Sequence, residues 1–195
     1  MANFTEEFMK TVGPQAASQI AKTLGIDVKT ATQIIPQVTP LILSGLKKQS
    51  EQHGGQARVD HILNKYGSAS VLDDIAGLIK QKSNDTKPDP KLGGLLGDSG
   101  VQATNMIANQ FKLDTKTAMK LIPILAPLIL GSLTKKRDSA GAGSSGIAAI
   151  LDQDGDGSIL DDVAGFLLGS KTTGSSKSGS NILGSILGGL FGKRG

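Results

Sequence analysis

Hydrophobic residues recur every three to four positions along most of the chain, which is the spacing of an amphipathic α-helix. From Ala16 to Leu24 the apolar positions follow this period, and Gly25 is a suitable stop for that helix. A second helix is expected from Asp27, a suitable N-cap, to about Lys48. No stretch alternates with the period of two that a half-buried β-strand requires. The pattern predicts an all-α protein.

The second predicted helix occurs twice. The 20 residues DVKTATQIIPQVTPLILSGL, which begin at Asp27, match DTKTAMKLIPILAPLILGSL, which begins at Asp114, at 11 positions. Pro36 and Pro40 have counterparts in the second copy, and each proline removes a backbone donor, so both helices are expected to kink or split there. The second copy is apolar on every side, which predicts burial at the centre of the fold.

Two further segments recur in the same order, SVLDDIAGL as SILDDVAGF and LGGLLG as LGGLFG. Three matched segments predict a tandem duplication of a small multi-helix unit. The first helical repeat is assigned to residues 1–97 and the second to residues 98–195. The second repeat contains a Gly/Ser-rich linker at about 170–180 and ends in an amphipathic helix.

Composition narrows the class of protein. Hydrophobic residues make up 38% of the 195 residues but aromatic ones only 3%, so the core is aliphatic. The absence of Cys excludes disulfides and thiolate chemistry. A net charge of +4 permits nucleic acid or an anionic membrane as partner without requiring either. The N-terminus is acidic where a secretory signal is basic, and the longest apolar run, 121–130, is about half a membrane span. A soluble, cytoplasmic protein is expected.

The motifs in combination point to a family. The sequence LGID followed by TA, the pattern IP-x-x-x-PLIL, the segment DGDGSILDDVAG and the tail LGGLFGK together resemble the YidB-like bacterial family, domain of unknown function 937. Through its two copies, the resemblance covers nearly the whole chain. It implies a helical bacterial domain and supplies no reaction.

One loop resembles a calcium site. DQDGDGS, beginning at Asp152, places acidic residues at positions 1, 3 and 5 of a helix-loop-helix calcium loop, but Val163 stands where a bidentate Glu is expected. The first copy lacks these loop acids yet keeps Asp73 and Asp74, so the paired acids that follow the loop are interpreted as helix caps. The alternative to a weak calcium loop is a plain Asp-Gly turn. The candidate ligands are Asp152, Asp154, Asp156, Ser158 and, at an unusual spacing, Asp162.

The segment IAKTLGIDVKTATQI has the spacing of a DNA-binding helix-turn-helix, with a small residue, a glycine turn and apolar anchors. Two packed helices around any short turn give the same pattern, and Lys112 replaces Gly25 in the second copy. DNA binding is therefore an alternative function. The side chains that would face DNA are Lys29, Thr30, Gln33, Lys116 and Lys120.

The C-terminal segment 181–195 has one apolar stripe and a basic end, as in a helix that lies on a membrane surface. Because LGGLLG at 92–97 is a shorter version within the chain, docking of such segments onto their own helical unit or a neighbour's is favoured. A peripheral membrane protein is a second alternative function.

Nothing in the sequence favours catalysis. His53 and His61 have no counterparts in the second copy and no evident partners for acid–base or metal chemistry. Phosphate loops, nucleophile elbows and dinucleotide motifs are absent. The leading hypothesis is a non-catalytic helical structural or protein-interaction protein, whose partner is a second copy or another protein.

Overall fold

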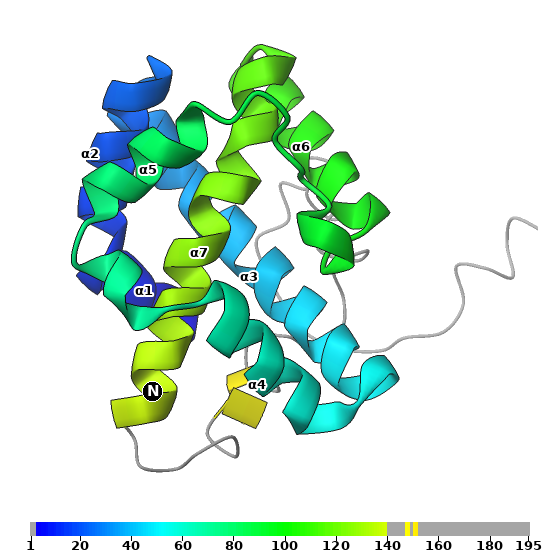
Figure 1. The fold of residues 1–195 in the computed structure, drawn as a ribbon. Coiled ribbons are helices and arrows are strands. Elements are labelled where there is room, and N and C mark those ends of the chain that lie inside the picture. Colours follow the sequence, from blue (N-terminus) through cyan, green and yellow to red (C-terminus); the bar gives the residue numbers. More distant parts are fainter. Residues whose placement is uncertain (1–2, 140–146, 149, 152–195) are drawn as a thin grey trace, which may run out of the picture. The chain divides into compact units, whose positions relative to one another are not determined.

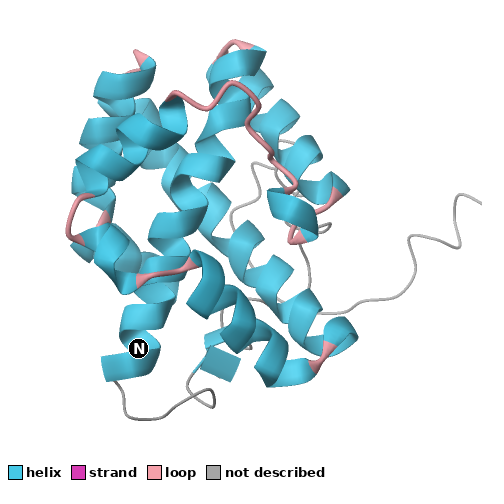
Figure 2. Ribbon diagram, in the orientation of Figure 1, coloured by secondary structure: helices cyan, strands magenta, loops and turns pink. Residues whose placement is uncertain are grey.

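The computed structural model describes residues 3–139, 147, 148, 150 and 151, all within one compact unit, Met1–Ile159. In this part of the chain the regular elements are α-helices and two short 3₁₀ helices, with no strand, as Figures 1 and 2 show. The all-α prediction is confirmed. The elements are α1 (Phe4–Thr11), α2 (Gly13–Leu24), α3 (Val28–His53), α4 (Gly55–Tyr66), η1 (Ala69–Leu72), α5 (Ile75–Ser83), η2 (Leu92–Gly94), α6 (Asp98–Phe111) and α7 (Thr115–Ser139).

The two similar sequences form the same helix pair, α2 with α3 and α6 with α7. A tight left-handed turn ends the first helix of each pair, at Gly25 with φ 68° and at Lys112 with φ 52°. The turns lie at the same end of the bundle, and α3 and α7 both run away from that end (Figure 1).

Both long helices continue through their prolines. α3 contains Pro36 and Pro40, and α7 contains Pro123 and Pro127, each within a single helix. The prediction that the prolines split each helix in two is therefore wrong. Apart from Gln37, the direct neighbours of the four prolines are buried, so packing outweighs the loss of one backbone hydrogen bond per proline.

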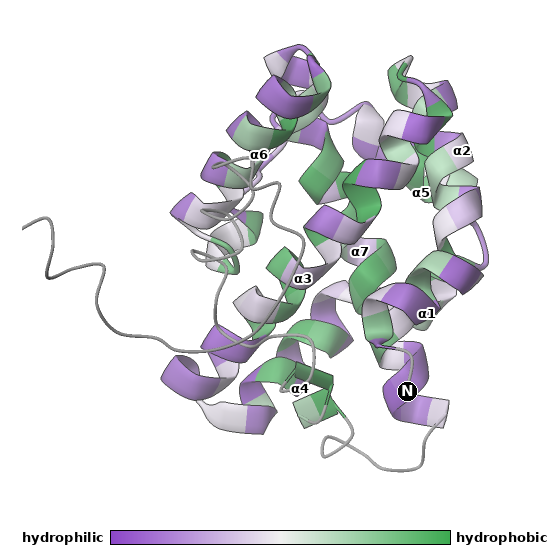
Figure 3. Ribbon diagram, turned by 180° about the vertical axis from the view of Figure 1, so that it is seen from behind, coloured by the Kyte–Doolittle hydropathy of each residue, from purple (hydrophilic) through white to green (hydrophobic). Residues whose placement is uncertain are grey.

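The core is built around α3 and α7. Their matched apolar positions are buried in both helices, and α7 also buries Ile124, whose counterpart Gln37 in α3 is half-buried. Figure 3 shows hydrophobic positions along α7 and mostly hydrophilic positions on α6. The predicted burial of the second copy's central helix is confirmed.

Elements of the first repeat cover the central helix of the second. α4 packs against both α3 and α7, and η1 and α5 pack against α7. The helical residues Ile147 and Leu151 are buried in the same core, at the positions that Val59 and Leu63 occupy in the first copy. The boundary between 1–97 and 98–195 therefore separates two similar sequences but not two separate cores. In the described region both repeats contribute to a single core.

One close approach and two polar links join α7 to the first repeat. A Cβ on Gly67 would lie 2.8 Å from the backbone of Leu130, so α4 ends directly against α7. Arg137, near the end of α7, donates to Asp60 at 3.3 Å and to Asn64 at 3.0 Å, both on α4. The end of α7 is also tied to α1, by an ion pair of Lys136 with Glu7.

Candidate functional site

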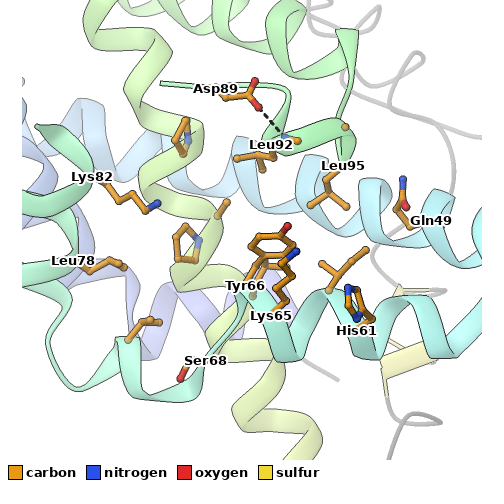
Figure 4. A pocket seen from close by; sticks show the side chains of 18 of the residues that line it. Gln49, His61, Lys65, Tyr66, Ser68, Leu78, Lys82, Asp89, Leu92 and Leu95 are labelled. Carbon is orange, nitrogen blue, oxygen red and sulfur yellow. Dashed lines mark hydrogen bonds between the residues drawn. The ribbon is translucent and has the colours of Figure 1, made fainter. Parts of the chain in front are cut away.

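A groove of about 1010 Å³ runs between α4, α5, α7 and the segment 85–95, and it opens to solvent (Figure 4). The elements that form it are distant in sequence and come from both repeats. The groove therefore forms only where elements of both repeats pack together, and no single sequence motif predicts it.

The floor of the groove is a face of α7. Pro123, Ala126, Pro127 and Leu130 lie at positions i, i+3, i+4 and i+7, which align on one side of a helix. Because proline has no N–H, the carbonyls of Met119 and Pro123 lose the donor four residues further on. Two carbonyls of α7 are therefore left without their intrahelical donor.

Apolar side chains also form the walls. Leu78 of α5, Leu92 of the 85–95 segment and Tyr66 of α4 border the groove from three elements (Figure 4), and Ile62 of α4 also lines it. Tyr66 is 56% exposed, and among the large hydrophobic residues that the structure describes it shares such exposure with Val28 alone. An exposed aromatic residue beside an apolar groove is typical of a protein-binding surface.

Four Arg and Lys side chains line the groove: Arg58, Lys65, Lys82 and Lys87. Arg58 donates through Nε to Gln49 at 3.0 Å, and the Nζ atom of Lys65 lies 5.2 Å from the ring centroid of Tyr66. Within the described part of the chain, Lys82 and Lys87 have no ion pair.

The two carboxylates on the groove accept backbone hydrogen bonds. Asp85 accepts from the N–H of Lys87 at 3.2 Å. Asp89 accepts from the N–H groups of Lys91 at 2.9 Å and Gly93 at 2.8 Å, the latter drawn in Figure 4. These acids hold the turn in shape, and the groove keeps an excess of positive charge.

The segment LGGLLG positions one wall of the groove by docking on α3. A Cβ on Gly45 of α3 would lie 2.8 Å from Cδ2 of Leu96 and 2.9 Å from the carbonyl oxygen of Leu95. Leu96 is buried there, whereas Leu92 lines the groove. The expectation that such segments dock on the protein's own helices is confirmed for 92–97.

Sequence reasoning missed the groove, although one signal was present. His53, His61 and Tyr66 all lie along it, and none has a counterpart of the same type in the second copy. His61 and Tyr66 are exposed on α4, and His53 is exposed at the end of α3. Residue types found in only one copy therefore marked this surface.

The paired acids of the LDD-x-AG motif were interpreted as helix caps, and Asp74 confirms this in the first copy. Its Oδ1 accepts from the N–H of Gly77 at 2.8 Å, at the start of α5. A Cβ on Gly77 would overlap the Asp74 carboxylate, which explains why glycine follows at this position.

The candidate calcium ligands Asp152, Asp154, Asp156, Ser158 and Asp162 lie outside the described residues. Among the residues that are described, no group of three or more His, Cys, Asp or Glu side chains could hold a metal ion. The calcium loop stays a prediction.

The candidate DNA-binding residues fall into two groups. Lys29, Gln33 and Lys116 are exposed near the two turns, and Thr30 is half-buried. Lys120 instead donates through Nζ to the carbonyl of Ser83 at 2.6 Å, which satisfies an acceptor at the end of α5. The turns share one end of the bundle in Figures 1 and 3, so the exposed members lie at that end.

Segment 181–195, the candidate membrane contact, also lies outside the described residues. Of the helices in the described part, α7 alone is long and apolar enough to cross a membrane, and 67% of its most apolar window is buried against the rest of the protein. This is the position of a core helix, for which length and composition are weak evidence of a membrane span.

The fold and the groove define an all-α protein in which two similar helical units share one core around two proline-containing helices. The chain belongs to the family described as bacterial protein of unknown function, DUF937, whose model matches residues 6–136 and 134–193. The first match crosses the repeat boundary and includes both proline-containing helices. No curated protein and no solved structure shows a significant match to the chain.

Proposed function

We propose that this chain is a non-catalytic helical protein that binds a protein partner in the groove between α4, α5 and α7. The observation that carries this proposal is the groove itself, an apolar floor and walls with a basic rim and the exposed Tyr66. Buried apolar contacts supply most of the affinity of protein interfaces, and surrounding charges add specificity.

Site-specific photo-crosslinking in the producing cells tests this. A benzophenone amino acid at position 66 stands inside the proposed interface, and the same residue at position 28 is the control, since Val28 is 50% exposed at the end of the bundle where the α2–α3 turn lies. We expect a discrete protein adduct from position 66 that position 28 does not give. No adduct, or identical adducts from both positions, would contradict the proposal.

DNA binding is the second candidate function. It is supported by the two helix pairs with tight turns at one end of the bundle, where Lys29 and Lys116 are exposed. The acids Asp27 and Asp114 stand at the start of the second helix of each pair and oppose an approaching phosphate backbone. This charge pattern places DNA binding behind protein binding.

A mobility-shift assay over a range of salt concentrations tests the DNA candidate. Binding that weakens with salt and is lost when Lys29 and Lys116 become Glu would support it. Exposed Lys48 and Lys10, changed together to Glu, give a matched control with the same change in net charge. Equal shifts for both double variants would remove the candidate.

A further inference from the structure

We propose that the partner segment is an amphipathic helix with an acidic flank, and that about two of its turns lie in the groove. This inference rests on the proposed protein-binding function and adds the chemistry of what is bound. It follows from the charge of the rim, the shape of the groove and its open side.

The rim selects for negative charge. Two of its cations, Lys82 and Lys87, have no ion pair within the described part of the chain. The nearby carboxylates of Asp85 and Asp89 already accept backbone hydrogen bonds. An acidic flank would place Asp or Glu opposite the free ammonium groups, whereas a basic segment would add like charges.

The size of the groove fits a helix. A cylinder about 10 Å across and two helical turns long has a volume of roughly 850 Å³. The groove has about 1010 Å³ and a floor of residues spaced i, i+3, i+4 and i+7 on α7. Ala126 and Leu130 are buried, and Pro123 and Pro127, one turn apart, are the partly exposed residues of this floor. The apolar face of a bound helix would therefore contact the two proline rings.

The open side favours a peptide over a lipid chain. A bound amphipathic helix keeps its polar face in water while its apolar face is covered. An acyl chain has no polar face, and its sites enclose most of its surface. Tyr66 is exposed and projects from α4 into the groove, where an aromatic ring can pack against one side of a helix.

Display selection tests the inference on the full chain. The probe is a random library of peptides of about 15 residues, roughly four helical turns. Selected peptides are measured against the wild type, against Lys82→Glu/Lys87→Glu, and against Lys10→Glu/Lys22→Glu. The last is the control, because both lysines are exposed on α1 and α2 outside the groove and the net charge changes equally.

The fluorescence of Tyr66 reports where a peptide binds, because the chain has one Tyr and no Trp. We expect enriched peptides with apolar residues at i, i+3 or i+4, and i+7 and with Asp or Glu beside them. Their binding should change the Tyr66 signal and weaken about tenfold or more in the groove variant but not in the control.

The contrary outcomes separate the two proposals. If no selected peptide perturbs Tyr66, both the proposed function and this inference fail. If peptides perturb Tyr66 but lack acidic residues and bind the groove variant equally well, only the inference fails. It also fails if oleate alone perturbs Tyr66, which would indicate an amphiphile site, or if the signal depends on protein concentration without peptide, which would indicate a second copy.

Discussion

The left-handed turn before each central helix has Gly25 in one repeat and Lys112 in the other. This conformation costs a residue with a Cβ roughly 1–2 kcal/mol, and glycine avoids that cost. Replacement by glycine also raises the conformational entropy of the unfolded chain, which lowers the free energy of unfolding by about 0.4–1 kcal/mol. The relief of strain is the larger effect, so the second repeat carries a local strain that the first lacks.

Lys112→Gly should therefore raise the free energy of unfolding by about 0.5–1 kcal/mol, measured by urea denaturation. Lys112→Ala is the control: it removes the same charge but keeps the Cβ, and it should give no such gain. Equal stabilisation by both substitutions would show that the lysine charge, and not the backbone, is responsible.

The aspartates after these turns also differ. Asp114 accepts from the N–H of Thr117 at 2.9 Å, whereas Asp27 makes no side-chain cap bond. Hydrogen bonds from the side chain and the backbone of Thr117 hold the pKa of Asp114 below its usual value. A lowered folded-state pKa gives stability that is present above the unfolded pKa and is lost as the pH falls through the folded pKa.

Asp114→Ala should therefore lower the thermal midpoint near neutral pH, and its difference from the wild type should shrink below about pH 4. Asp27→Ala is the matched control and should have a smaller effect, because Asp27 makes no side-chain cap bond. The check is a series of thermal melts from neutral to acidic pH. A difference for Asp114→Ala that stayed constant across this range would count against the cap as its cause.

At the scale of elements, an exchange of two neighbouring residues decides what packs on each central helix. The matched sequences read LILSGL in α3 and LILGSL in α7, so glycine stands at Gly45 in one and Gly131 in the other. The absence of a side chain at Gly45 lets the 95–96 segment approach α3. At Gly131 it lets η1 approach α7, since a Cβ on Gly131 would lie 2.8 Å from the carbonyl oxygen of Ser68. Each glycine permits a different short segment to approach.

Gly131→Ala should lower the free energy of unfolding by about 1–2 kcal/mol. Overpacking against Ser68 and Val71 costs roughly 1–3 kcal/mol, and the better helix propensity of alanine returns at most about 1 kcal/mol. Ser44 occupies the matched position of α3 and already has a Cβ, so Ser44→Ala should leave the free energy of unfolding nearly unchanged. Chemical denaturation of both variants provides the comparison, and equal effects would argue against the close approach of η1.

The helices and their order were predictable because their signals are local: a period of 3.6, a glycine stop at Gly25 and a cap at Asp74. The continuity of α3 through Pro36 was not, since it depends on packing from elsewhere in the chain. The groove was not predictable because it joins α4 and α5 to α7, and these elements are far apart in the sequence. The contact of Lys120 with Ser83 is of the same kind.

At the scale of the whole molecule, we expect that the first repeat does not fold without the second. Its elements α4, η1 and α5 pack on α7 of the second repeat. A fragment of residues 1–97 would leave these faces without the helix that they cover, and exposing such apolar surface costs about 25 cal/mol per Å². We expect the fragment to show no cooperative thermal transition by circular dichroism. A cooperative monomeric transition would instead identify the repeat as an independent domain.

The same fragment tests whether the Ser-Gly exchange prevents a symmetric dimer. Since α3 matches α7 at 11 of 20 aligned positions, α3 of a second fragment could take the place of α7. Ser44 would then stand where Gly131 admits η1, and its Cβ would meet Val71 and the carbonyl of Ser68. Ser44→Gly in the 1–97 fragment should therefore produce a folded dimer in sedimentation experiments, with stability that rises with concentration. Ser44→Ala keeps the Cβ, so this control fragment should not dimerise. If both variants dimerised to the same extent, the exchange of Ser and Gly would not be what prevents the symmetric dimer.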